Sequence, residues 1–233
     1  MWDKTATYVY GNPAKNRYNR IIEIRAGRPR TFHYKGETIM PKITFMGAGS
    51  TVFAKNVLGD CIMTPEIENL NIWLYDIDPV RLDDSHKMLE HIIANTDRHD
   101  VTVHATLDRI EALTGANYVV NAIQVGGYEP CTVTDFEIPK KYGLRQTIAD
   151  TLGIGGIFRT LRTIPVLEGF ARDMEKVCPD ALFINYTNPM AMLSGFMQRY
   201  TDIRTVGLCH SVQSCVPELL KTFKMEEYTD KCR

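Results

Sequence analysis

The sequence predicts an α/β fold in which helices wind over both faces of a parallel β-sheet, a doubly wound arrangement. Two observations support this. Short apolar runs alternate with segments of helical periodicity from Met40 onward, and the first run ends in a glycine-rich turn that opens a helix. Strands that alternate with helices form parallel βαβ units. Composition agrees, because 44% of the 233 residues are hydrophobic and 24% are charged, as in globular proteins.

Short apolar runs mark the predicted strands and longer periodic segments mark the predicted helices. Pro79 is placed in the first turn of its helix, where a missing N–H is harmless, and Pro165 is expected to break a long helix. The stretch that follows the glycine-rich loop 125–128 is expected to be irregular. The predicted strands are 43–46, 71–75, 101–105, 118–123, 181–185 and 203–208. The predicted helices are 50–63, 79–93, 108–113, 157–177, 191–199 and 217–223.

Residues 1–39 differ in charge from the rest of the chain. They carry eight Lys or Arg and three acidic residues, a net charge of +5 that leaves −6 for the remainder. We interpret this segment as a poorly ordered leader that precedes the first strand. The alternative is a basic arm that binds an anionic partner.

Composition also bounds the partners and the compartment. The net charge of −1 argues against general nucleic-acid binding, because such binding needs surplus positive charge. No apolar run approaches the roughly 18 residues of a membrane span, and no secretory signal is visible. The six cysteines include no C-x-x-C pair. We therefore expect a cytoplasmic protein with reduced thiols and no nucleic-acid or membrane partner.

The glycine-rich turn after the first strand has the pattern of a dinucleotide site. Gly47 permits a tight turn, Gly49 lets the backbone approach a pyrophosphate, and the next helix begins there. The second strand ends at Asp76, where a carboxylate can hold ribose hydroxyls and favours NAD over NADP. The third glycine of the motif is missing, because Val52 occupies its place. The simpler interpretation is that Asp76 and Asp78 are only strand-end and helix-cap residues.

Several polar side chains fall beyond the predicted strand ends, where ligands bind in doubly wound sheets. Asn188 is able to hold a sugar hydroxyl or a nicotinamide edge. The alternative is that Asn188 and Pro189 form a simple turn before a helix. Cys209 and His210 are able to bind a metal or move protons. Spacing alone favours a buried thiol and a hydrogen-bonded imidazole for that pair. The full set of polar residues is Asn121, Gln124, Asp150, Asn185, Asn188, Cys209 and His210.

A group of motifs, taken together, is much more specific than the glycine loop alone. From Met40 to about Phe223 the chain resembles the NAD- and manganese-dependent glycosidases of glycoside hydrolase family 4, and most closely their α-galactosidase branch. The resemblance implies the Rossmann-like fold of lactate and malate dehydrogenases. Residues 1–39 have no counterpart. The motifs are GAGST at 47–51, DID at 76–78, QVGGY at 124–128, TIADTLGIGGIFR at 147–159, NYTNPM at 185–190 and GLCHS at 207–211.

The resemblance also implies a domain division and a set of site residues. Residues 40–190 are expected to form the NAD-binding domain, and 191–233 the start of a truncated substrate domain. The cofactors implied are NAD and Mn2+, and the substrate is a small glycoside. The implied residues are Gly47, Gly49, Ser50, Thr51, Asp76 and Gln124 for NAD, Asp150 and Asn188 for the sugar, Cys209 for the metal, and His210 for catalysis.

The chemistry implied by the resemblance is hydrolysis by an oxidation and an elimination, in place of the usual pair of carboxylates. NAD+ takes hydride from the sugar C3, a base removes the C2 proton, and the bond from C1 to the glycosidic oxygen breaks. Water then adds at C1 and the hydride returns, while the metal acts as a Lewis acid on the C2 and C3 oxygens. The Cys-His-Ser sequence at 209–211 argues against phosphorylated sugars.

The chain also departs from the family pattern. The expected second metal ligand, a histidine, and the expected tyrosine base have no counterpart before Arg233. We therefore expect a fragment that is inactive alone, from a parent that hydrolyses α-galactosides and is a homo-oligomer. The alternatives are an α-galacturonidase or α-glucosidase of the same family, a 2-hydroxy-acid dehydrogenase, and an NAD-binding module without turnover.

Overall fold

The structure is a computed structural model that describes residues 33–34, 37–38, 40–148, 150–209 and 211–231. Most of the predicted leader (1–32, 35–36 and 39) and the predicted catalytic residue His210 lie outside the described residues. Within the leader, β1 (His33–Tyr34) pairs antiparallel with β2 (Glu37–Thr38).

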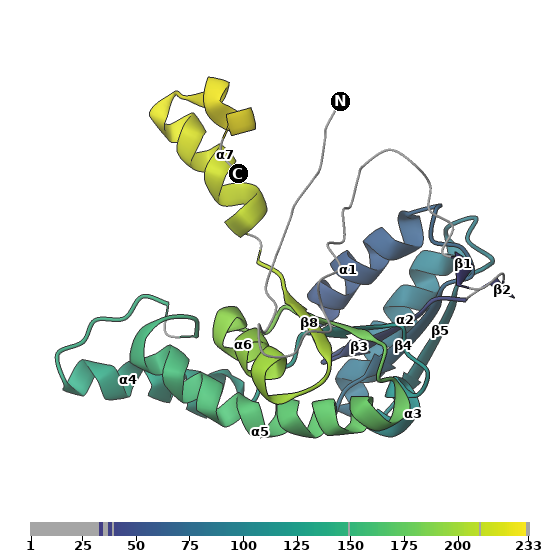
Figure 1. Cartoon of the computed structure of the whole chain (residues 1–233), viewed down its shortest axis with the longest axis horizontal. Helices are drawn as coiled ribbons and strands as arrows, with labels where there is room; N and C mark the ends of the chain where they lie inside the picture. The colour runs from purple at the N-terminus through teal and green to yellow at the C-terminus, as the bar shows by residue number, and fades with distance from the viewer. Residues whose placement is uncertain (1–32, 35–36, 39, 149, 210, 232–233) are drawn as a thin grey trace.

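Six parallel strands form the central sheet in the order β5-β4-β3-β6-β7-β8 (Figure 1). This is the doubly wound order, in which the direction of winding reverses between β3 and β6. The predicted fold class is therefore confirmed. The strands are β3 (Lys42–Met46), β4 (Asn71–Tyr75), β5 (Thr102–Thr106), β6 (Tyr118–Asn121), β7 (Leu182–Asn185) and β8 (Arg204–Gly207).

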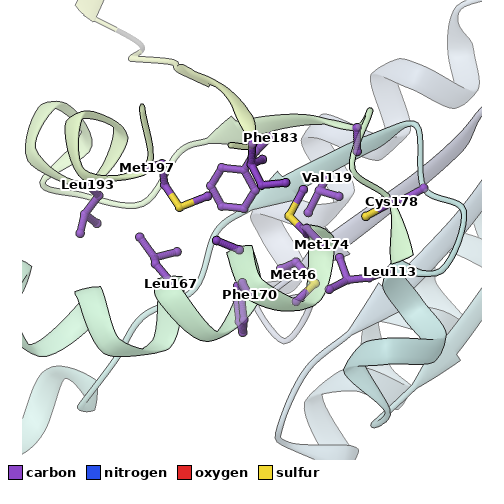
Figure 2. Close-up of a cluster of buried hydrophobic side chains, with 14 residues drawn as sticks. Met46, Leu113, Val119, Leu167, Phe170, Met174, Cys178, Phe183, Leu193 and Met197 are labelled. Carbon is purple, nitrogen blue, oxygen red and sulfur yellow. The ribbon is translucent and has the colours of Figure 1, made fainter. Parts of the chain in front are cut away.

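Helices cover both faces of the sheet, and each face has its own apolar core. The neighbouring residues Val119 and Val120 of β6 point into opposite cores, as alternation along a strand requires. Figure 2 shows one core, where Phe183 of β7 packs near Leu167 and Met197. Burial on both faces explains why the strands read as nearly continuous apolar runs. One face carries α1 (Thr51–Met63) and α2 (Pro79–Ala94), and the other carries α3 (Arg109–Leu113), α5 (Gly153–Val177) and α6 (Met190–Tyr200).

Two predictions about helices were wrong. The helix α5 is not broken at Pro165 and runs without interruption through it. Its face toward the core buries Leu167 and Phe170, and this packing offsets the cost of a missing N–H. The stretch predicted as irregular contains a π-helical turn, η1 (Gly127–Thr132), and the helix α4 (Val133–Lys141), which lies against α5.

The last described elements are α7 (Ser211–Phe223) and the 3-10 helix η2 (Glu226–Lys231), which extend away from the sheet (Figure 1). The helix α7 begins six residues earlier than the predicted start at residue 217. None of the helices in the described part of the chain combines the length and the apolar content of a membrane crossing.

Candidate functional site

The turn between β3 and α1 is held by the end of β4. The N–H groups of Gly47 and Ala48 both donate to the carbonyl of Tyr75, each at 3.0 Å. Gly47 has φ +87°, a conformation that L side chains rarely adopt. A Cβ built on Gly47 would lie 2.8 Å from the carbonyl oxygen of Ala122, so β6 also closes against this turn.

Asp76 lies directly against the second glycine. Its Oδ2 accepts the Gly49 N–H at 2.7 Å, and its Oδ1 accepts the Asp78 N–H at 3.0 Å. A Cβ on Gly49 would stand 2.8 Å from the same Oδ2. Each carboxylate oxygen has a further lone pair for a ligand hydroxyl. Gly47, Gly49 and Asp76 thus form a cradle in which the glycine turn closely approaches an acidic strand end and leaves no room for a side chain at Gly49. This arrangement suits a dinucleotide whose ribose meets an acidic residue.

The N-terminus of α1, next to the glycine turn, has no side-chain cap. The N-cap residue Ser50 makes no side-chain cap hydrogen bond, and the turn contains no acidic residue. Thr51 Oγ1 lies 3.3 Å from Ser85 Oγ, which donates to the Ala48 carbonyl at 2.5 Å. A helix N-terminus with free capping capacity and no negative side chain favours an anion such as a pyrophosphate.

An open pocket of about 190 Å³ lies beyond the carboxyl ends of β3, β6 and β7. It brings together four predicted site residues from distant parts of the chain: Ser50, Gln124, Asp150 and Asn188. One wall is aromatic, because the rings of Phe53 and Tyr186 meet edge to face with centroids 4.8 Å apart. Burial raises the pKa of the Tyr186 phenol, which is therefore neutral at pH 7. The remaining lining residues are Ala122, Ile123, Arg159 and Thr187.

A buried amide network fixes the loop that carries Asn188. Asn185 and Asn121 are both fully buried, and Asn121 Nδ2 donates to Asn185 Oδ1 at 2.9 Å. Asn185 Oδ1 also accepts the Thr187 N–H at 3.1 Å, and Thr187 Oγ1 donates to the Ile123 carbonyl at 2.9 Å. The loop between β7 and α6 is therefore tied to the end of β6, which orders the backbone next to Asn188.

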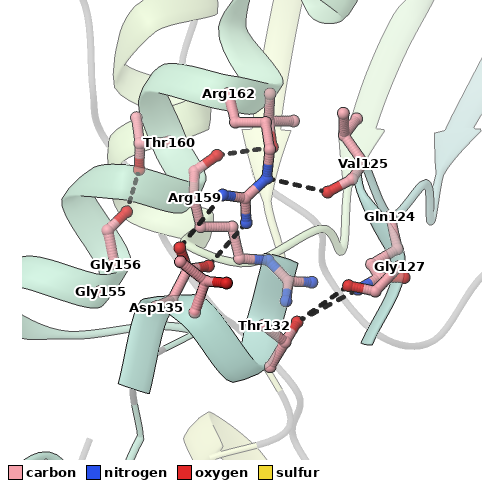
Figure 3. A network of polar contacts seen from close by, with 12 residues as sticks. Gln124, Val125, Gly127, Thr132, Asp135, Gly155, Gly156, Arg159, Thr160 and Arg162 are labelled. Atoms are coloured by element: carbon pink, nitrogen blue, oxygen red, sulfur yellow. Dashed lines mark hydrogen bonds and ion pairs between the residues drawn. The ribbon is translucent and has the colours of Figure 1, made fainter. Parts of the chain in front are cut away.

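A second polar network includes Gln124, one of the lining residues (Figure 3). Arg162 of α5 makes paired hydrogen bonds to Asp135 of α4, at 3.1 and 2.6 Å. Arg162 Nε donates to the Val125 carbonyl at 3.1 Å. Gln124 Nε2, one residue earlier, donates to Thr132 Oγ1 at 3.3 Å. The paired contacts raise the pKa of Arg162, so this guanidinium is permanently charged.

The predicted metal ligand does not share the pocket. Cys209 follows β8, is exposed, and is not among the lining residues. In the described ranges no three His, Cys, Asp or Glu side chains come together as a metal site would require. The described residues therefore supply one predicted ligand, Cys209, and not a complete manganese site, since such an ion needs several ligands.

Six lining residues were not predicted as site residues, and three of them carry an aromatic ring or a charge: Phe53, Arg159 and Tyr186. Phe53 had no distinguishing signal, because an aromatic residue near a helix start is an ordinary core residue. Tyr186 stands in the motif NYTNPM at 185–190, which was the available signal. Arg159 is the last residue of the motif 147–159, and its place in that motif was the available signal. Thr51, in contrast, was predicted and lies beside the turn, outside the pocket.

Comparisons with known proteins agree with this geometry. A family model described as Family 4 glycosyl hydrolase matches residues 42–225. An alpha-galactosidase of Bacillus subtilis is 63% identical, covering 80% of this chain and 43% of that protein. An alpha-glucosidase of Erwinia rhapontici is 36% identical, covering 78% and 41%, and an alpha-galacturonidase of Thermoanaerobacter italicus is 34% identical, covering 82% and 41%. The chain thus spans less than half the length of these relatives.

Solved structures agree as well. The 6-phospho-beta glucosidase of Thermotoga maritima, solved with manganese, NAD+ and glucose-6-phosphate, has a TM-score of 0.66 at 26% identity, covering 79% of this chain and 43% of that one. The lactate dehydrogenase of Eimeria maxima, solved with NADH and oxamate, has a TM-score of 0.52 at 18% identity, covering 79% and 50%. The second likeness shows the fold alone, and it confirms the dehydrogenase-like architecture.

Proposed function

Because the chain belongs to family 4 of the glycosyl hydrolases, we propose that it forms the dinucleotide-binding part of an enzyme that hydrolyses α-galactosides with NAD and manganese. The observation that carries the proposal is the cradle of Gly47, Gly49 and Asp76 beside a polar pocket at the reversal point of the sheet. Identity to a relative named alpha-galactosidase is 63%, against 36% for one named alpha-glucosidase, and this supports the galactoside assignment.

The residues of the cradle have separate roles in this proposal. Asp76 would accept the hydroxyls of the adenosine ribose, and Gly49 would let the backbone approach the pyrophosphate. Ser50 and Thr51 stand at the positive end of α1, where the phosphate charge is stabilised. When bound, NAD+ supplies a hydride acceptor for oxidation of a sugar carbon.

The pocket residues would orient the sugar. Asn188 carries an amide that both donates and accepts, and its loop is fixed by the buried network of Asn185. Asp150 adds an acceptor for the sugar at the same pocket, and Gln124, the proposed NAD residue, also lines it. These groups match the hydroxyls of a neutral sugar. Cys209 is the proposed metal ligand and His210 the proposed catalytic residue.

We also propose that the whole enzyme acts in the cytoplasm and assembles as a homo-oligomer, as the family resemblance implies. Its substrate is a small glycoside.

A segment exchange tests the proposed activity. Residues 42–225 would replace the matching segment of the Bacillus subtilis relative, and hydrolysis of nitrophenyl α-glycosides would be followed. We expect hydrolysis that requires NAD+ and Mn2+ and that favours the α-galactoside over the α-glucoside by at least about tenfold, because the pocket discriminates between hydroxyl positions. The unexchanged relative is the control. A folded exchange protein that preferred the α-glucoside or the α-galacturonide would contradict the assignment.

A further inference from the structure

The pocket contains one opposed pair of charges. Of the described residues that line it, Arg159 is the single cation and Asp150 the single anion. Arg159 stands on α5, and Asp150 lies in the segment before that helix. A cavity with one donor group and one acceptor group of opposite charge is electrically balanced, yet each group is able to form charge-assisted hydrogen bonds.

Arg159 is anchored by only part of its guanidinium. Its Nε donates to the carbonyl oxygen of Asn188 at 3.1 Å, which fixes the side chain beside the sugar-binding loop. The structure gives no hydrogen bond or ion pair from its Nη1 or Nη2 to any residue it describes. Asp135 of α4, a second carboxylate whose charge acts on Arg159, is already paired with Arg162. Figure 3 shows the guanidinium of Arg159 beside that pair, on the side of Gln124 and Thr132.

The side chain of Arg159 is only partly buried. Burial lowers the pKa of Arg159, and the nearby charge of Asp150 opposes the shift. A guanidinium has five N–H donors, and Nη1 and Nη2 are not among the buried polar atoms without a partner, so they are available to a ligand in the pocket. A ligand with two neighbouring oxygen atoms would satisfy the two Nη groups together, because the guanidinium fork is planar and rigid.

We propose that Arg159 is a specificity-determining residue that donates from Nη1 and Nη2 to two neighbouring oxygens of a neutral sugar, while Asp150 accepts from a hydroxyl of the same ring. This inference rests on the proposed function and names the substrate class that the pocket selects. Arg159 serves the sugar and not the nicotinamide, because the oxidised ring is itself cationic and a second positive charge repels it.

The pair selects against charged sugars. A carboxylate or phosphate on the ring would gain from Arg159 but would face the like charge of Asp150 in the same pocket. A neutral sugar has hydroxyls that donate and accept, so it satisfies both side chains without repulsion. The opposed charges therefore favour a neutral glycoside over a uronide or a phosphorylated sugar.

The test is saturation-transfer NMR on the full 233-residue chain, with and without NAD+. The probes are methyl α-galactoside, methyl α-galacturonide and galactose 6-phosphate. We expect the wild-type chain to give the strongest signal with methyl α-galactoside. Arg159→Met is expected to lower that signal at least about fivefold, because two charge-assisted hydrogen bonds are lost. Arg159→Lys, which keeps the charge but not the fork, is expected to lower it by a smaller factor.

Two further variants sharpen the result. Arg172→Met removes an exposed arginine from the same helix, and its sugar signal is expected to match the wild type. Asp150→Asn is expected to raise the signals of the two charged sugars relative to the neutral one, since it removes the repelling carboxylate. This arm decides the proposal even where Arg159→Met does not fold.

Three outcomes would overturn the inference: no signal from methyl α-galactoside with the wild-type chain, an unchanged signal in folded Arg159→Met, or the strongest wild-type signal from a charged sugar. NAD+ binding is measured separately in the same samples. If the chain binds NAD+ but its sugar signal is the same in the wild type and in folded Arg159→Met, only the inference is contradicted. A folded chain that fails to bind NAD+ contradicts the proposed function, and the sugar signal without NAD+ still judges Arg159.

Discussion

Replacing Gly47 by alanine is expected to lower the free energy of unfolding by about 3 kcal/mol or more, since steric overlap adds to backbone strain. The new Cβ would lie 2.8 Å from the carbonyl oxygen of Ala122 and 2.9 Å from the nitrogen of Ile123. Both are backbone atoms at the end of β6, so neither can rotate away. The φ of +87° adds strain for any residue with a side chain. Urea unfolding followed by circular dichroism measures the change.

A glycine inside α1 provides the matched control. Gly59 lies within the helix, and a Cβ there would meet nothing within 4 Å. Gly59→Ala is therefore expected to stabilise the chain by about 0.5–1 kcal/mol through helix propensity. A Gly47→Ala chain as stable as the wild type would show that the turn is not packed as described.

Removing the carboxylate of Asp135 is expected to cost about 2–4 kcal/mol, because it leaves the charge of Arg162 without its partner in a partly buried position. Asp135 is only 2% exposed, and both of its oxygens accept from Arg162. Arg162 also holds the Val125 carbonyl, so Asp135→Ala should loosen α4 and the loop before it. Chemical unfolding gives the energy, and limited proteolysis shows whether cleavage moves to α4.

An exposed pair on the same helix separates this effect from a loss of charge alone. Lys140 and Glu137 form a salt bridge at 2.5 Å with both side chains more than half exposed. Glu137→Ala is expected to change stability by less than about 0.5 kcal/mol, because solvent screens such pairs. Equal costs for Asp135→Ala and Glu137→Ala would refute a special role for the buried pair.

The sequence was sufficient to predict the sheet and the glycine turn with Asp76. The strand 71–75 and the helix start at Pro79 were predicted at their observed positions, because apolar runs and a proline in the first turn are local signals. The glycine turn and Asp76 were predicted for the same reason, since they follow strands at a known spacing. Local pattern fixes what lies next to each strand end.

The α4–α5 region could not be predicted from local pattern. Pro139 lies within α4 and Pro165 within α5, and both residues normally mark a break. What holds these helices is long-range: the pair of Asp135 with Arg162 spans 27 positions, and α5 buries Leu167 against the sheet. Tertiary packing overrode the local signal of the prolines.

The pocket was also only partly visible in the sequence. Gln124, Asp150 and Asn188 were predicted because they follow strands or stand in a recognisable motif. Arg159 was not, because its role depends on a contact with the carbonyl of Asn188, 29 positions away. A side chain on a helix shows no sign of which distant loop it meets until the fold is known.

The central claim is that the chain binds NAD+ through the turn between β3 and α1. A calorimetric titration of NAD+ into the 233-residue chain tests it, with Asp76→Ala as the variant and the exposed Asp83→Ala as the matched control. We predict saturable binding that Asp83→Ala leaves unchanged and that Asp76→Ala weakens at least about tenfold, since a charged acceptor of hydrogen bonds is lost. A folded, monodisperse chain that does not bind NAD+, or one whose affinity ignores Asp76, would contradict the claim.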